Sequence, residues 1–287
     1  MTAIDDRTRI IALSLTRSVG WKLTHRLLER FSTLEAIFAA DVEELRTVHG
    51  IGPQIASNIC AIDLCRLVED LERFQAQGIT AAAWQDTIYP LRLLEIEDKP
   101  LALFWKGTLL PADEQAVAIV GTREASNDSL RLAQRYAAAF AERGWTVISG
   151  MARGIDSAAH QGALAAGGRS IAVLGCGVNV IYPPENAALA KQIASSGALL
   201  SEIHPNTAPS PNALMRRNRL ITALSRAVIV VEAGATSGAL YAARCGRDQG
   251  RPVFAINNSA GNVELLEQFA RPLPANVDEM IGQIGSI

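Results

Sequence analysis

The chain has 287 residues, of which 49% are hydrophobic and 20% are charged, a composition typical of a globular protein with one large or two modest domains. Its formal net charge of −2 argues against a nucleic-acid-binding protein held by a general positive field, and an aromatic content of 5% argues against extensive base stacking. The sequence shows no secretory signal and no apolar run long enough to span a membrane. Its four cysteines lack the spacing of metal ligands or of a redox motif. We therefore expect a cytoplasmic protein with reduced thiols, no bound metal, no cofactor and no membrane partner.

Residues 1–72 have the pattern of several short amphipathic helices and predict a small all-α domain. Within it, a helix is expected to end before Gly50-Ile51-Gly52, and Pro53 stands where the next helix would begin. This segment resembles a helix-hairpin-helix motif, whose turn presents backbone N–H groups to a nucleic-acid phosphate. A weaker copy covers Leu15 to Phe31. Few basic residues lie near either turn, so DNA contact, a protein–protein contact and a purely structural role all stay open for this domain.

Residues 73–287 alternate apolar runs with helical segments. The runs cover residues 117–120, 146–148, 170–174, 197–200, 227–231 and 252–256. Near-continuous Val, Ile, Leu and Ala is what a parallel strand covered on both faces requires. The order of the runs predicts an α/β domain with a doubly wound, mainly parallel sheet, which shorter strands before residue 116 would extend. The chain is accordingly expected to divide into domains at 1–72 and 73–287.

Two polar turns follow the first two of these apolar runs. The run at 117–120 breaks into Gly121-Thr122-Arg123, and the run at 146–148 breaks into Ser149-Gly150-Met151-Ala152-Arg153-Gly154. A right-handed crossover places both turns at the same carboxyl edge of the sheet, where ligands bind in open α/β folds. Glycines, hydroxyls, free N–H groups and an arginine suit a phosphate. The glycines could serve only to permit tight turns, but two such turns side by side favour a phosphate site.

The segment Arg217-Asn218-Arg219 precedes a helix and can reach the same rim. Asp156, Glu202 and Glu232 are expected there too, where they could orient the arginines or accept hydrogen bonds from a base. Common enzyme signatures are missing: Gly175-Cys176-Gly177 fails the third glycine of a dinucleotide fingerprint, and neither a P-loop nor a nucleophile elbow occurs. His160 and His204 have no nucleophile beside them in sequence and are interpreted as structural.

Taken in order, these motifs resemble the DNA-processing protein A (DprA/Smf) family over nearly the whole chain. The resemblance rests on Val120-Gly121-Thr122-Arg123, Ser149-Gly150-Met151-Ala152-Arg153-Gly154-Ile155-Asp156, Leu174-Gly175-Cys176-Gly177, Tyr182-Pro183, Ser201-Glu202, Arg217-Asn218-Arg219, Val231-Glu232-Ala233 and Ser237-Gly238-Ala239-Leu240. It implies an extended Rossmann-like fold behind a helix-hairpin-helix or sterile-alpha-motif-like domain. It also implies a homodimer that binds and protects single-stranded DNA and helps load the RecA recombinase in natural transformation, without being an enzyme.

The site expected at the rim combines the resemblance with the pattern of turns. The nucleic-acid contacts are expected at Gly121, Thr122, Arg123, Ser149, Gly150, Arg153, Arg217, Asn218 and Arg219, with support from Asp156, Glu202, Glu232, Ser237 and Gly238. No catalytic residue is expected. Arg123 and Arg217 each lie beside a turn or helix start whose N–H groups can share an anion, so these two are expected to contact phosphate directly. Arg247 and Arg251, at the amino end of the last strand, should matter much less.

The chain departs from the family pattern at Met215, Tyr241 and Asn257-Asn258. The alternative from another class is a Rossmann-like nucleotide phosphoribohydrolase of the lysine-decarboxylase-like group. That group has a Gly-rich turn, which is weakly similar to Glu232-Ala233-Gly234-Ala235-Thr236-Ser237-Gly238. The remaining glycines and the glutamate of that group's motif are absent. A third possibility is a RecA-partner or dimerisation scaffold with degraded DNA binding.

Overall fold

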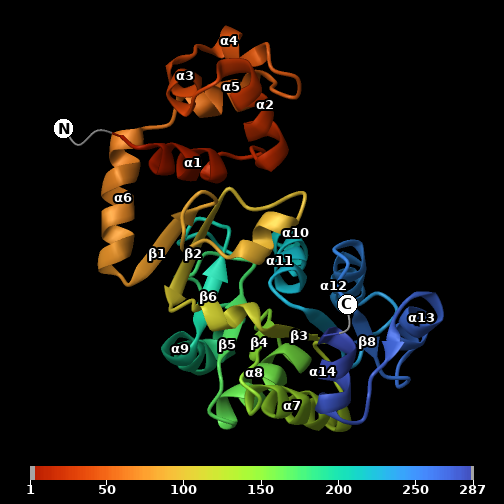
Figure 1. Ribbon diagram of the computed structural model, residues 1–287. Helices are drawn as coiled ribbons and strands as arrows, with labels where there is room; N and C mark the ends of the chain where they lie inside the picture. The colour runs from red at the N-terminus through yellow and green to blue at the C-terminus, as the bar shows by residue number, and fades with distance from the viewer. Residues whose placement is uncertain (1–3, 286–287) are drawn as a thin grey trace. The chain divides into compact units, whose positions relative to one another are not determined.

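The computed structural model describes residues 4–285, which form two compact units (Figure 1). The first extends to Phe104 and includes Glu202–His204, and the second comprises Trp105–Ser201 and the chain from Pro205 onward. The first strand, at residues 79–83, belongs to the first unit, and the domain boundary expected at residues 72 and 73 stays a prediction. Within residues 4–285 no helix has the length and apolar character that crossing a bilayer demands.

The first unit is built mainly from short helices around a shared apolar core. Side chains of Asp5, Thr33, Asp41 and Asp63 accept the first free N–H groups of four of them, which is how such short helices begin at defined residues. Gly50, at φ +96°, and Pro53 at the first helical position make the hairpin turn that the sequence predicts. The elements are α1 (Asp6–Leu15), α2 (Trp21–Phe31), α3 (Leu34–Ala39), α4 (Val42–Arg46), α5 (Pro53–Cys60), α6 (Leu64–Ala76), β1 (Ile79–Ala83), the 3-10 turn η1 (Leu91–Glu95) and β2 (Ala102–Gly107), which begins in this unit.

The second unit alternates strands and helices, as the apolar runs predict. Its elements are η2 (Pro111–Glu114), β3 (Ala116–Val120), α7 (Asn127–Ala141), β4 (Thr146–Ser149), α8 (Ile155–Ala165), β5 (Ser170–Val173), η3 (Pro184–Asn186), α9 (Ala187–Ser196), β6 (Ala198–Ser201), α10 (Pro211–Arg216), α11 (Asn218–Ala223), β7 (Ala227–Val230), α12 (Gly238–Asp248), β8 (Val253–Ala255), α13 (Ala260–Gln268), β9 (Arg271–Pro272) and α14 (Val277–Gly285).

The strands of the second unit lie in the order β6-β5-β4-β3-β7-β8-β9, and each neighbouring pair is parallel. The chain winds outward from β3 through β4, β5 and β6, then returns to place β7 on the other side of β3. The strand order therefore reverses between β3 and β7, a topological switch point at which open α/β sheets bind ligands. The α/β class with a mainly parallel, doubly wound sheet is confirmed.

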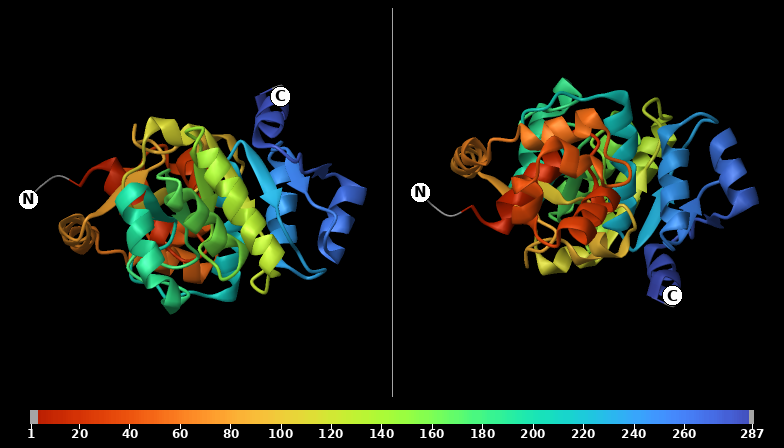
Figure 2. Two further views of the ribbon diagram at one scale, coloured as in Figure 1. Left: turned by 90° about the horizontal axis from the view of Figure 1, so that it is seen from below. Right: turned by 90° about the horizontal axis from the view of Figure 1, so that it is seen from above.

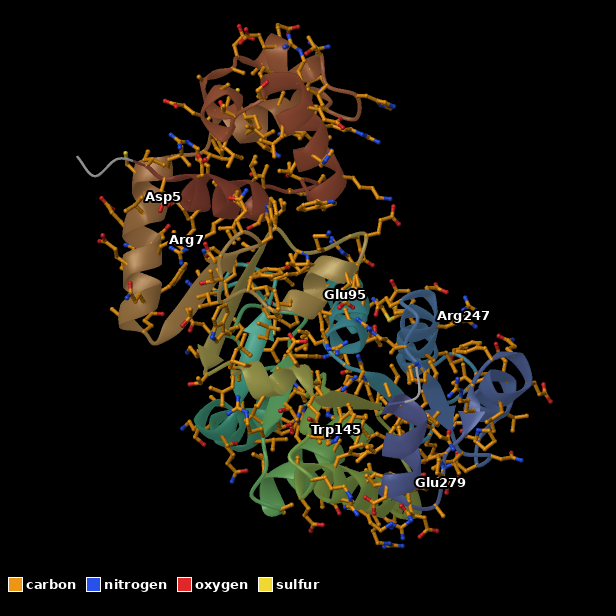
Figure 3. The ribbon with its side chains drawn as sticks, in the orientation of Figure 1. Asp5, Arg7, Glu95, Trp145, Arg247 and Glu279 are labelled. Atoms are coloured by element: carbon orange, nitrogen blue, oxygen red, sulfur yellow. The ribbon has the colours of Figure 1, made fainter. Side chains whose placement is uncertain are left out.

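Helices bury the strands of the second unit. Every residue of β3, β4, β5, β6 and β7 is buried. Figure 2 shows α7 and α8 together over one face, and Trp145 packs edge-to-face on Phe140 of α7, with ring centroids 5.4 Å apart (Figure 3). This burial is the physical reason for the apolar runs, since a strand covered on both sides has no face to offer water.

His160, on α8, is fully buried and its environment favours the neutral imidazole. Ser170 Oγ donates its single proton to the Val147 carbonyl at 2.9 Å, so His160 Nδ1, 2.7 Å away, must donate to that oxygen. Among the described residues no hydrogen-bond partner reaches Nε2. Burial, with a smaller contribution from the Arg217 charge, lowers the pKa of His160 to about 3. Both side chains of this Ser–His pair are fully buried, which excludes a substrate from them.

The polar turns after β3 and β4 pack directly on each other. The Ile155 N–H donates to the Thr122 carbonyl at 3.2 Å. Gly154 has φ +74° and ψ −126°, a backbone conformation open essentially to glycine alone. A β-carbon at this position would also lie 2.3 Å from the Thr122 carbonyl oxygen. The close approach of the two turns therefore depends on Gly154.

Acid should destabilise the wild type more steeply than a variant without the buried imidazole. The pKa of His160 is lower in the folded chain than in the unfolded one, so its contribution is complete above about pH 6.5 and is lost as pH falls toward 3. In chemical denaturation between pH 6.5 and 4.5, the unfolding free energy of the wild type should fall relative to His160→Gln by about 1.4 kcal/mol per pH unit. Parallel curves for the two proteins would contradict this account.

The packing of the turns predicts a stability difference between two glycine substitutions. Gly167 has φ +72° but open space around its α-carbon, so Gly167→Ala should cost only the left-handed backbone strain, about 1–2 kcal/mol. Gly154→Ala adds a steric overlap with backbone and should lower the unfolding free energy by about 3 kcal/mol or more. Urea unfolding of both variants measures the difference, and equal losses would show that the turns can move apart without cost.

Candidate nucleic-acid interface

The carboxyl ends of β3, β4 and β7 surround a cavity of about 330 Å³. Its walls come from segments far apart in the sequence: the turn after β3, the start of α8, the α10–α11 junction and the loop before α12. The lining residues are Val120, Gly121, Thr122, Arg123, Glu124, Ala152, Asp156, Leu214, Met215, Arg217, Asn218, Gly234, Thr236, Ser237, Gly238, Ala239 and Ala242. The structure thus brings the predicted turns and the predicted arginine segment to one place.

A second, smaller recess adjoins the first. It is lined by Arg123, Gly150, Ala152, Arg153, Tyr182, Pro183, Leu214 and Arg217. Arg123, Ala152, Leu214 and Arg217 line both spaces, so the cavity and the recess form a continuous surface, here called the rim. The rim lies entirely within the second unit.

Arg123 is the most available cation of the rim. Its side chain is exposed, and within residues 4–285 neither an ion pair nor a hydrogen-bond acceptor engages it. The turn that carries it is well held: the Thr122 N–H donates to the Glu232 carbonyl at 2.7 Å, and the Glu124 N–H donates to Thr122 Oγ1 at 3.3 Å. A fixed backbone with a free guanidinium is suited to an incoming anion.

Arg153 is exposed like Arg123 but already has a partner. Its side chain forms an ion pair with Glu185, which follows the Tyr182-Pro183 segment. The hydrogen bond and charge of Glu185 raise the pKa of Arg153, and the same contact lowers the pKa of Glu185. A phosphate at Arg153 would therefore compete with a carboxylate that the chain itself supplies.

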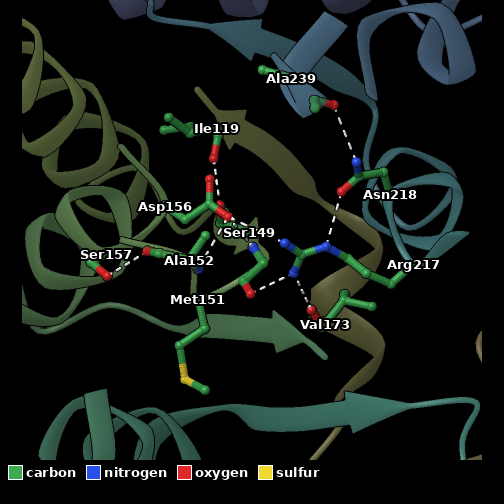
Figure 4. Close-up of polar contacts among 12 residues, drawn as sticks. Ile119, Ser149, Met151, Ala152, Asp156, Ser157, Val173, Arg217, Asn218 and Ala239 are labelled. Atoms are coloured by element: carbon green, nitrogen blue, oxygen red, sulfur yellow. Dashed lines mark hydrogen bonds and ion pairs between the residues drawn. The ribbon is translucent and has the colours of Figure 1, made fainter. Parts of the chain in front are cut away.

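Arg217, Asn218 and Arg219 are buried, in contrast to the exposed face that an arginine cluster usually forms. The Arg217 guanidinium donates to the carbonyls of Gly150 and Val173, and its Nε donates to Asn218 Oδ1 at 2.9 Å (Figure 4). Arg219 lies in the first turn of α11, and its carbonyl accepts from Gln249 Nε2 at 2.9 Å. The two arginines expected to touch phosphate thus differ in setting: Arg123 is open to solvent and Arg217 forms the floor.

Asp156 is the buried acidic partner of this floor. Its Oδ2 accepts the N–H groups of Gly150 at 3.2 Å and Ala152 at 3.3 Å, and lies 3.7 Å from Arg217 Nη2. Burial raises the pKa of Asp156, while the Arg217 charge and these hydrogen bonds act against the rise. Burial also lowers the pKa of Arg217, which Asp156 opposes and Arg123 reinforces. At the floor of the cavity, Arg217 and the nearby Arg123 therefore place two positive charges against the one buried carboxylate of Asp156.

The remaining residues expected to support the rim are placed as follows. Glu232 follows β7, and its Oε2 accepts from the N–H and the hydroxyl of Ser126, both at 3.0 Å, at the start of α7. Burial alone would raise the pKa of Glu232, but hydrogen bonds from Ser129 and Ser126 lower it. Ser149 Oγ donates to the Ile119 carbonyl at 2.6 Å and joins β4 to β3. Ser237 caps α12 and lines the cavity with Gly238. Ser149, Glu232 and Glu202 line neither space of the rim, and Glu202 belongs to the first unit.

Tyr182, Leu214 and Thr236 line the rim but were not among the expected site residues. The sequence does contain a signal for Tyr182. It lies in the polar segment after β5, and ligands in open α/β folds bind at the carboxyl ends of the strands. Leu214 and Thr236 carry no such signal, since an apolar residue on a short helix and a threonine in a loop are common on any surface.

Two of the departures from the family pattern, Met215 and Asn258, make contacts that fix neighbouring elements. Met215 Sδ lies against Gly238, where a β-carbon would be 3.5 Å away, so Met215 packs at the start of α12. Asn258 Nδ2 donates to the Val231 carbonyl at 2.9 Å and to Ser129 Oγ at 3.2 Å, and thereby ties the end of β7 to α7. Tyr241 lies on α12 with 37% of its surface exposed.

Within the described part of the chain, no three or more His, Cys, Asp or Glu residues lie together as metal ligands would.

Comparison with known proteins gives a consistent assignment. Residues 80–285 match the family model of DNA recombination-mediator protein A, and residues 9–61 match that of a helix-hairpin-helix motif. The chain is 36% identical over 291 aligned positions to protein Smf of Synechocystis, covering 96% of this chain and 72% of that protein. It is 35% identical to the DNA processing protein DprA of Bacillus subtilis, with 72% of each chain covered.

Two solved structures are similar as well. DNA processing protein A of Streptococcus pneumoniae aligns over 95% of both chains with a TM-score of 0.80 and 30% identity. DNA processing protein A of Helicobacter pylori, described for its single-stranded DNA binding mode, aligns over 72% of this chain and 96% of its own with a TM-score of 0.64 and 30% identity. The family-model match spans most of the sheet and the whole rim, so this chain belongs to the DNA recombination-mediator protein A family, also known as DprA/Smf.

Proposed function

We propose that this protein binds single-stranded DNA at the rim and acts in DNA recombination. The observation that carries the proposal is the exposed guanidinium of Arg123, which no described residue pairs with and which lies beside the buried charge of Arg217 at a topological switch point. Two nearby cations with one buried carboxylate attract an anion, although the chain as a whole is slightly acidic. The single-stranded DNA binding of the Helicobacter pylori relative supports the same ligand class.

The shape of the rim favours a single strand over a duplex. Duplex readers insert a helix or a β-ribbon into a groove, but here α10 and α11 are each six residues long and, like the N-terminal ends of α8 and α12, form the wall of the rim. A cavity and recess lined by turns instead suit a flexible backbone whose phosphates can enter one at a time. Phosphate contacts carry no sequence information, so we expect little dependence on base composition.

Asp156 and Glu232, two carboxylates expected to support the rim, are engaged within the protein, which favours a binding role over the nucleotide-hydrolase alternative, and the other acidic residue that lines the cavity is the exposed Glu124. Asp156 accepts two backbone N–H groups and lies against Arg217, and Glu232 is engaged by Ser126. A hydrolase needs a carboxylate with a free oxygen aimed at the bond to be broken. We propose a non-enzymatic binding protein, and nucleotide hydrolysis assays run beside the DNA-binding measurements test that choice.

The resemblance to DprA proteins extends the proposal to partners and location. On that basis the protein acts in the cytoplasm as a homodimer, protects incoming single strands and helps load RecA recombinase during natural transformation. The proposed DNA-binding site comprises Gly121, Thr122, Arg123, Gly150, Arg153, Arg217 and Asn218, which line the rim, together with Ser149 and Arg219, which are buried and line neither of its spaces.

A competition experiment tests the ligand class. With a labelled oligo-dT bound to the full chain, unlabelled single strands should displace the probe at much lower concentration than a duplex of the same length. A gel shift or fluorescence anisotropy gives the result. Equal displacement by both forms would argue for a general polyanion site, and absence of binding would refute the proposed function.

The salt dependence of binding tests the role of Arg123. Removing one phosphate contact should reduce the slope of log K against log salt by about 0.7 for a single strand. We expect this reduction for Arg123→Gln and no change for Arg247→Gln, an arginine on α12 paired with Asp248 away from the rim (Figure 3). The opposite variant is Glu185→Gln, which frees Arg153 and should tighten binding with a steeper slope. If Arg123→Gln left DNA binding unchanged, or if Arg247→Gln weakened it, the DNA would not bind at the carboxyl edge.

A further inference from the structure

Most of the hydrogen-bond donors of the Arg217 side chain are used within the protein, which leaves few for a phosphate. It stands at the junction of α10 and α11, and its side chain points inward, with 7% of the side chain exposed. Three of its five N–H groups donate to protein acceptors: one from Nε to Asn218 and two from Nη1 to the Gly150 and Val173 carbonyls. Few donors are left for a ligand.

The two carbonyls that Arg217 binds belong to neighbouring parallel strands. Val173 is the last residue of β5, and Gly150 directly follows β4. Carbonyl groups at the carboxyl end of a strand have run out of ladder partners and must find other donors. One guanidinium nitrogen satisfies both, and thereby fixes where the turn after β4 leaves the sheet.

The turn after β4 is held from both sides of Gly150. Arg217 binds the carbonyl of Gly150 while Asp156 accepts the Gly150 N–H (Figure 4). A β-carbon on Gly150 would lie 1.8 Å from Arg217 Nη1, so glycine is required for the guanidinium to lie flat against the backbone. Beyond Gly150 the turn passes through Met151 at φ +59°, a left-handed conformation that a free chain would not keep.

Through Asn218, Arg217 is also linked to the opposite wall of the cavity. Asn218 accepts from Arg217 Nε and donates its Nδ2 hydrogen to the Gly238 carbonyl at 3.2 Å, at the start of α12. The contacts run without interruption from β5 through Arg217 and Asn218 to the loop before α12. Both walls of the cavity are therefore joined through one guanidinium.

We propose that Arg217 is a positioning residue, which holds the turn at residues 150–154 and the start of α12 in their DNA-binding arrangement and does not bind phosphate itself. This inference rests on the proposed function for its effect on DNA. It assigns the direct phosphate contact to Arg123 and explains why an arginine is buried at the floor of an anion site. Lysine could replace a phosphate ligand, but it cannot form the fork to Gly150, Val173 and Asn218.

The test uses Arg217→Lys, with Arg123→Lys as the matched control at the exposed arginine. Each variant is first checked for folding by thermal unfolding. Binding of oligo-dT by fluorescence anisotropy and amide hydrogen exchange of the DNA-free protein are then measured. We expect Arg217→Lys to bind about tenfold more weakly than the wild type, because charge-assisted hydrogen bonds are lost, and to exchange faster at residues 150–154. Arg123→Lys should keep most of the affinity and leave that exchange unchanged.

The outcomes separate this inference from the proposed function. Arg217→Lys with wild-type affinity, or with weakened binding but unchanged exchange at residues 150–154, would overturn the positioning role. Faster exchange with unchanged affinity would overturn it as well. If the wild type binds no single strand, the proposed function fails while the exchange arm still reports whether Arg217 holds the turn. Should Arg217→Lys fail to fold, the double variant Asp156→Asn/Arg217→Gln removes both buried charges together and is judged by the same two measurements.

Discussion

Parallel strands that stop at one edge of a sheet leave carbonyl groups without ladder partners, and this requirement organises the carboxyl edge of the second unit. Side chains supply the missing donors. Ser149 Oγ donates to the Ile119 carbonyl, and Asn262 Nδ2 donates to Val230 and Val231, both at 3.1 Å. Arg217 does the same for Gly150 and Val173. The polar residues that follow the strands therefore satisfy backbone groups of the fold itself, whether or not a ligand is present.

The rim also shows how a slightly acidic protein can attract an anion. A net charge of −2 gives no long-range pull toward DNA, and at physiological salt charges farther apart than about 8 Å are largely screened. Attraction has to come from cations held close together in a recess that partly excludes water. Arg217 keeps its charge inside the protein because Asp156 lies 3.7 Å away, and Arg123 completes the positive side from the surface.

The helical unit presents a different electrostatic picture. Several basic side chains near its hairpin turns are engaged by the unit itself: Lys22 pairs with Glu97 at 2.6 Å, and Arg46 pairs with Glu43 at 2.8 Å. Arg26 donates to the His49 carbonyl at 3.2 Å and so closes the turn at Gly50. These contacts leave less free charge for a phosphate than the shape of the hairpin suggests, and they fit a structural or protein-contact role for this unit.

Local patterns in the sequence determined the elements of both units and the edge at which the site lies. Apolar runs specified buried parallel strands because such strands have no polar face, and Gly50 and Pro53 specified the hairpin because few other residues suit those backbone positions. The turns after β3 and β4 could likewise be predicted to lie side by side.

Only the tertiary structure decided the state of each charged side chain. Arg123, Arg153 and Arg217 look alike in sequence, yet the first is exposed with no partner within residues 4–285, the second is paired with Glu185 and the third is buried. Burial and partners depend on segments that meet only in the folded chain, such as Gly150 and Val173 at the Arg217 fork, and no spacing along the sequence encodes those contacts.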